Sequence, residues 1–114
     1  ERILNTYNDS LNQVTIESYD GNGNFKPNKY GISIHKKYFE PNDKKDVIEE
    51  FFYDSENKQV DADHYQLSSR AHFDLIYSHI KRVKKGNEWT THYYNAKGEE
   101  VCQETPFGEI MIIE

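Results

Sequence analysis

One short motif occurs three times in this chain and constrains its fold more than any other feature. Each copy has a Tyr, then Asp or Asn, and three positions later a Gly or Asn; the copies begin at Tyr19, Tyr53 and Tyr94. Gly and Asn adopt the positive φ angles that tight hairpin turns require. Because the copies are 34 and 41 positions apart, a spacing typical of repeated supersecondary units, they predict a series of β-hairpins.

The segments around these motifs alternate apolar and polar residues, the pattern of half-buried β-strands. It predicts strands over residues 13–19, 30–40, 46–54, 88–95, 99–103 and 107–113. The stretch from Pro41 to Lys45 separates two of them because Pro, Asn and Asp favour turns. Residues 1–12 fit either a first strand or a helical turn.

The segment 69–85 has two interpretations. Leu75, Ile76, Ile80 and Val83 fall at helical spacing, which favours an amphipathic helix. Ala71, Phe73, Leu75 and Tyr77 alternate instead, as in a strand. Because the equivalent part of the first repeat is a strand, we prefer a long hairpin that is bulged near 76–80 and turns at Lys85-Gly86-Asn87.

We therefore expect an all-β fold, an antiparallel sheet built from about two and a half hairpin repeats. The alternative is an α+β fold with a helix near 69–84. The 114 residues correspond to a single domain, with repeat units at about 13–52, 53–92 and 93–113. Nine Tyr, six Phe and one Trp predict a thin, aromatic-rich core, as in a single sheet or a small sandwich.

Charge and composition exclude several functions. The net charge of −6 argues against nucleic acid or an anionic membrane as the main partner, and we expect the basic run 81–85 to be a solvated strand end or turn. No stretch is apolar enough for membrane insertion. The single Cys102 excludes an internal disulfide and a Cys-based zinc site.

Metal-binding patterns are weak. His72 and Asp74 are two positions apart, so on a strand they would share a face, but a polar face opposite Ala71 and Phe73 explains them. The stretch from Asp20 to Asn24 resembles a calcium loop but lacks the late Glu ligand, and turn formation explains it. We expect no metal and no cofactor.

Catalytic patterns are weaker still. Cys102 and His92 would need an orienting third group to act as nucleophile and base, so we expect a buried thiol. Glu49 and Glu50 are adjacent and face opposite sides of a strand, which excludes an acid–base dyad between them. The sequence therefore predicts that the domain is not an enzyme.

Aromatic side chains are the most promising binding feature. An exposed row on a sheet would suit a sugar or an extended peptide. The candidate ligand-binding residues are Tyr19, Tyr53, Trp89, Tyr93 and Tyr94. The alternative is that these rings pack against each other across strands.

The motif copies resemble a known group of repeats. Tyr93 to Val101 and Phe52 to Val60 are similar to bacterial tandem Tyr-Asp-x-x-Gly β-hairpin repeats, which include MORN-like repeats. The resemblance implies an extended or curled antiparallel sheet, often on exported proteins and usually without catalytic activity.

The sequence does not define the ligand, oligomeric state, organism or length of the parent protein. The chain begins with Glu1, and we favour a removed signal peptide over trimming as the reason. We expect a non-catalytic binding or interaction module of an exported bacterial protein, secreted or in the cell envelope, with a protein or glycan ligand. The alternative is a structural repeat or spacer segment of a larger envelope protein.

Overall fold

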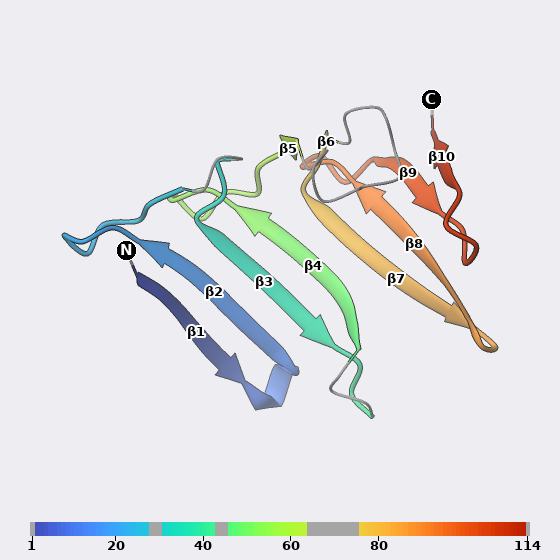
Figure 1. Ribbon diagram of the computed structural model, residues 1–114, viewed down its shortest axis with the longest axis horizontal. Helices are drawn as coiled ribbons and strands as arrows, with labels where there is room; N and C mark the ends of the chain where they lie inside the picture. Colours follow the sequence, from blue (N-terminus) through green and yellow to red (C-terminus); the bar gives the residue numbers. More distant parts are fainter. Residues whose placement is uncertain (1, 28–30, 43–45, 64–75, 114) are drawn as a thin grey trace.

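The described residues form one open antiparallel sheet of eight strands, in the order β1-β2-β3-β4-β7-β8-β9-β10 (Figure 1). The computed structural model describes residues 2–27, 31–42, 46–63 and 76–113. The strands of the large sheet are β1 (Arg2–Asn8), β2 (Gln13–Tyr19), β3 (Ile34–Phe39), β4 (Val47–Tyr53), β7 (His79–Lys85), β8 (Glu88–Tyr94), β9 (Glu100–Glu104) and β10 (Ile110–Ile112). A separate pair joins β5 (Ala62–Asp63) to β6 (Ile76–Tyr77).

This arrangement confirms the all-β prediction. Strand β7 pairs with β8 from His79↔Tyr94 to Lys85↔Glu88, and Gly86 between them has φ 64°. The helical interpretation is therefore wrong for residues 76–84, because 76–77 belong to strand β6 and 79–84 to strand β7. The remainder of that segment, 69–75, lies outside the described residues. Residues 2–12 combine both expected features: β1 is followed by a short 3₁₀ helix, η1 (Asp9–Leu11).

The three motif copies form the same turn. In the first, Asp20 Oδ1 accepts hydrogen bonds from the N–H groups of Asn22 (2.8 Å) and Asn24 (3.0 Å), and Gly23 has φ 85°. In the second copy, Asp54 Oδ1 accepts from the N–H groups of Glu56 and Lys58. In the third, Asn95 Oδ1 accepts from the N–H groups of Lys97 and Glu99. One side-chain oxygen thus closes each turn.

A fourth turn of the same kind was missed in the sequence. Thr105 Oγ1 accepts from the Glu109 N–H at 3.1 Å, and Gly108 has φ 84°. Thr here replaces Asp, and Glu104 replaces the preceding Tyr. A search for Tyr-Asp therefore does not find it, although the hydroxyl has the same role.

Two buried Ser residues connect successive motif turns. The Ser33 carbonyl accepts from Ser18 N–H at 3.1 Å, and its own N–H donates to Tyr53 O at 3.0 Å. In the same way, the Ser78 carbonyl accepts from Phe52 N–H at 3.0 Å, and the Ser78 N–H donates to Tyr94 O at 2.9 Å. The two halves of the sheet thus repeat each other in their backbone bonding.

The two faces of the sheet differ. The first, here called the core face, carries Phe52, Ile80, Tyr93 and Cys102, which are in or next to register across β4, β7, β8 and β9. With Ile32 and Tyr77 they form the buried core, against which Val60, Val101 and Ile110 pack. The opposite face, here called the ladder face, carries Phe51, His79 and Tyr94.

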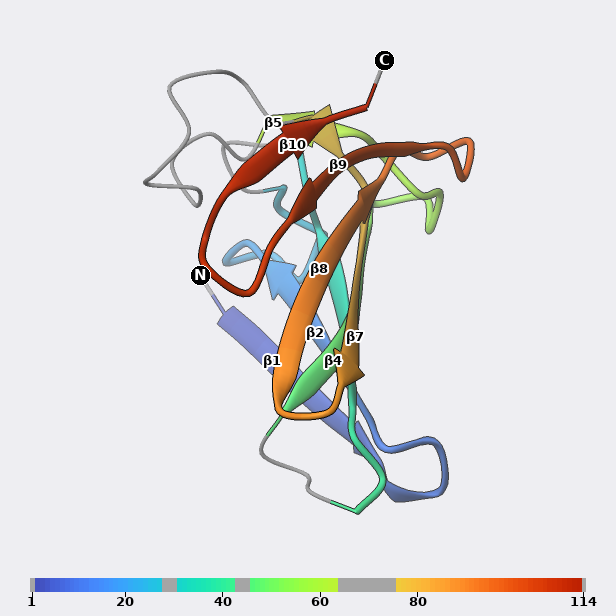
Figure 2. The same ribbon diagram turned by 90° about the vertical axis from the view of Figure 1, so that its right-hand side faces the viewer.

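The sheet is a single layer over most of its area. Among the described residues, the strands in extensive contact are the hydrogen-bonded neighbours, and the molecule measures 45 × 34 × 24 Å. Figure 2 shows the twist, with β1 and β8 lying at a clear angle to one another.

Candidate functional site

The most distinctive site lies where β4 and β7 separate. These strands share three register pairs, Glu49↔Lys81, Glu50↔Ile80 and Phe51↔His79, and then diverge toward the β7–β8 turn (Figure 1). At this point is an open pocket of about 300 Å³, lined by Asp46, Val47, Arg82 and Trp89. We call it the seam pocket.

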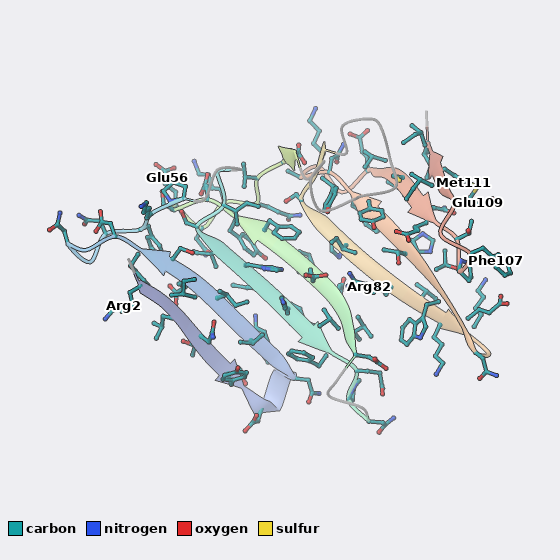
Figure 3. The ribbon with its side chains drawn as sticks, viewed as in Figure 1. Arg2, Glu56, Arg82, Phe107, Glu109 and Met111 are labelled. Carbon is teal, nitrogen blue, oxygen red and sulfur yellow. The ribbon has the colours of Figure 1, made fainter. Side chains whose placement is uncertain are left out.

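Arg82 forms the wall between the two strands (Figure 3). Its Nη1 lies 2.8 Å from Glu50 Oε2 and donates to the Val47 carbonyl at 3.3 Å. A carbonyl next to a diverging strand loses its ladder partner, and the guanidinium supplies a replacement donor. Arg82 therefore joins β4 to β7 beyond the end of their backbone pairing.

Glu50 fixes Arg82 in position. Its carboxylate, on a side chain that is 13% exposed, also accepts from His35 Nε2 at 2.9 Å. Burial works to raise the pKa of Glu50, but the hydrogen bond from His35 and the charge of Arg82 outweigh it and lower the pKa to about 2. The carboxylate is therefore charged near neutral pH and neutralises the guanidinium.

Trp89 supplies the aromatic wall of the seam pocket. It is the only Trp of the chain, is partly buried, and pairs with Lys84 across β7 and β8. The Lys84 Nζ lies 5.6 Å from the indole centroid, within the range of a cation–π contact. The exposed Asp46 adds a carboxylate to the lining, so an apolar surface and a negative charge meet in one hollow.

The five aromatic candidates do not form one row. Tyr93 is 9% exposed and packs in the core, with its ring 4.8 Å from Tyr77. Strand alternation places Trp89 on the same face, at the seam pocket, whereas Tyr19, Tyr53 and Tyr94 lie on the ladder face. The adjacent Tyr93 and Tyr94 necessarily point to opposite sides of the sheet.

The rings of the ladder face pack against each other. Phe51 and His79 are stacked at 4.0 Å with an interplanar angle of 11°, and His79 stacks on Tyr94 at 5.0 Å. Tyr53 has Lys36 Nζ 5.0 Å from its centroid. Because stacked rings cover each other's faces, this row fits cross-strand stabilisation better than the stacking of a sugar on an open ring.

Sequence reasoning missed the polar part of the seam pocket. Arg82 belongs to the basic run 81–85, whose side chains the strand divides between the two faces. Glu50 was noted for its neighbour Glu49, but its pairing with Arg82 depends on a strand register that no local pattern specifies. Trp89 was the one residue of the seam pocket that the sequence indicated, since a lone Trp on a strand is a common binding residue.

The nucleophile–base pair is not assembled. Cys102 is fully buried on the core face, where burial and the nearby Glu104 raise its pKa to about 11. His92 lies on the ladder face with its Nδ1 against Glu100 Oε2. A buried neutral thiol is unreactive, so Cys102 serves as a packing residue.

No metal site appears in the described part of the chain, where no three His, Cys, Asp or Glu residues come together. The pair His72 and Asp74 lies outside the described residues. The Asp20 carboxylate is engaged by two backbone N–H groups, as the turn interpretation predicts.

Helices able to cross a membrane are absent from the described residues. In comparisons with known proteins, no family model, curated protein or solved structure matches this chain.

Proposed function

We propose that this domain is a non-catalytic interaction module that binds an extended, basic segment of another protein. The observation that carries the proposal is the seam pocket, where Trp89 and Asp46 line one hollow beside the fixed guanidinium of Arg82. The bound segment inserts one apolar side chain against the indole and places a Lys or Arg next to Asp46.

The size and charge of the pocket support a peptide. A volume of about 300 Å³ is at the lower end for ligand sites and suits one side chain better than a whole cofactor. Arg82 is neutralised by Glu50, so Asp46 is the carboxylate that the pocket lining offers to a basic side chain, while the Lys84 ammonium lies against the Trp89 ring. The net charge of −6 also attracts basic segments at long range.

Ring stacking on the ladder face disfavours a glycan there. His79 is stacked on both Phe51 and Tyr94, and a sugar would have to separate these rings to stack on their covered faces. The resemblance of the motif copies to repeats of exported bacterial proteins supports a secreted or envelope parent, which is part of the proposal.

Trp89 allows a direct test, because the fluorescence of the chain's one Trp reports on this pocket. The probes are eight-residue peptides with Leu or Phe flanked by Lys, their Glu-flanked counterparts, and oligosaccharide fragments of peptidoglycan. We expect a saturable blue shift with the Lys-flanked peptides. Asp46→Asn should weaken binding about tenfold, as expected for one lost charge pair near 1.4 kcal/mol.

Glu56→Gln is the matched control, because it removes the same charge from an exposed turn that is distant from Arg82 in Figure 3. Equal weakening by both variants would indicate general charge attraction and contradict the seam pocket. A response to oligosaccharides alone would replace the peptide with a glycan.

A structural repeat or spacer is the second candidate function. The repeated turns and the equivalent bonds of Ser33 and Ser78 support it, because such regularity extends a sheet without requiring a ligand. No fluorescence change with any probe would favour this alternative.

A further inference from the structure

Strand β1 is an edge of the sheet formed by the described residues. All seven of its residues are exposed, with Ile3 at 68% and Tyr7 at 70%. Within the described residues, β1 has a hydrogen-bonded neighbour on one side, β2. The backbone N–H and C=O groups on its other side can therefore pair with a further strand.

The other edge, β10, is less suited to pairing. It has three residues, Ile110–Ile112, and follows a turn that contains Pro106 and Glu109. Short length, Pro and charge are the features that prevent edge association. Strand β1 lacks Pro and acidic residues, and its single charge is Arg2 at one end.

We propose that β1 pairs antiparallel with β1 of a second copy of this chain, so that two eight-stranded sheets form one continuous sheet. The two-fold axis passes by Asn5. Ile3 then lies opposite Tyr7 of the partner subunit, Leu4 opposite Thr6 of the partner subunit, and Arg2 opposite Asn8 of the partner subunit. All seven residues of the strand are paired in this register.

Side chains and charges fit this register. Ile3 and Tyr7 both lie on the core face, opposite Ser18 and Val14 of β2. Each dimer therefore has two pairs of an aromatic with a β-branched side chain, a combination favoured across strands. The two Arg2 side chains are six residues apart along the strands, about 20 Å. That exceeds the Debye length of about 8 Å at physiological salt, so they do not repel each other appreciably.

The strand lengths favour a closed dimer over a filament. Pairing of β1 with β10 of another copy would be limited to the three residues of β10 and would repeat without closing. The β1–β1 contact is self-complementary and leaves no second β1 free. Because each copy carries a charge of −6, higher salt should strengthen the dimer.

The test measures the mass of the 114-residue chain by sedimentation over a range of concentrations. We expect a species of twice the 13.5 kDa chain mass, and a dissociation constant at least tenfold weaker for Ile3→Lys. Phe107→Lys is the matched control, an exposed apolar residue in the turn between β9 and β10, and should leave the dimer unchanged. A monomer at all concentrations, or loss of the dimer in the control alone, would overturn the proposal.

A cysteine pair tests the register itself. Asn5→Cys places two thiols directly opposite each other, at a Cα separation of 4.5–5.5 Å that a disulfide spans. The native Cys102 is fully buried and does not compete. We expect rapid oxidation to a covalent dimer, and slow oxidation for Thr6→Cys, whose two copies are offset along the strands. Equal oxidation of both variants would contradict this register.

Discussion

Glu49 and Glu50 are neighbours in β4, yet they bind β7 from opposite faces of the sheet. Glu49 Oε2 lies 2.7 Å from His79 Nε2 on the ladder face, and Glu50 Oε2 lies 2.8 Å from Arg82 Nη1 on the core face. Because β4 and β7 share three register pairs, these two side-chain contacts add to a short backbone connection between the two halves of the sheet.

Removing Arg82 should weaken this connection. Arg82→Met leaves Glu50 without its cation and the Val47 carbonyl without its donor. Breaking a fully buried ion pair costs about 3–5 kcal/mol, and since Arg82 is partly exposed we expect about 2 kcal/mol, measured by urea unfolding. Lys84→Met is the control: Lys84 contacts Trp89 at the surface and should lose less than about 1 kcal/mol. Equal losses would show that the charge of β7, and not the Glu50 pair, matters.

Acid should remove the contribution of Glu50. Its pKa is lowered from 4.5 to about 2 in the folded protein, so the folded state binds this proton less readily than the unfolded state. The resulting stability is fully present above about pH 5 and is lost as the pH falls toward 2.

The difference in unfolding free energy between the native chain and Glu50→Gln measures this contribution. We expect the difference to shrink steadily between about pH 5 and pH 2, while the same comparison for the exposed Glu56→Gln stays flat. A constant difference for Glu50→Gln across this range would contradict the lowered pKa.

The parts of the structure that depend on local sequence were predictable, whereas the side-chain contacts between β4 and β7 were not. Asp20, Asp54 and Asn95 close turns through bonds within four residues, so each motif contains its own explanation. The contact between Glu50 and Arg82 joins two strands that are far apart in the sequence. Its prediction requires the pairing and register of β4 with β7, which no local pattern specifies. Thr105 was missed because a hydroxyl replaced a carboxylate, and Tyr93 separated from Tyr94 because adjacent strand residues face opposite ways.

Gly98 should be required for the third motif turn. Its φ of 85° lies in the left-handed region, where a side chain costs roughly 1–2 kcal/mol, so Gly98→Ala should lower the unfolding free energy by about that amount. Gly21→Ala is a matched control in the first motif turn: an added Cβ meets no atom within 4 Å there, and the φ of Gly21 is not positive. It should be neutral or slightly stabilising. A similar loss in both variants would show that the cost comes from general turn crowding.

Cys102 should be inert toward thiol reagents while the protein is folded. The side chain has no exposed surface, and burial together with Glu104 raises its pKa to about 11, so little thiolate forms at pH 8. A buried group of this kind reacts through opening of the structure, and we expect roughly hundredfold slower labelling by an aromatic disulfide reagent than in denaturing urea. Arg82→Met, which weakens the neighbouring contact between β4 and β7, should accelerate labelling by about thirtyfold, the factor that corresponds to a loss of about 2 kcal/mol. Rapid labelling of the stable native chain would instead reveal an accessible thiolate, and would reopen the catalytic interpretation that the burial of Cys102 and the position of His92 argue against.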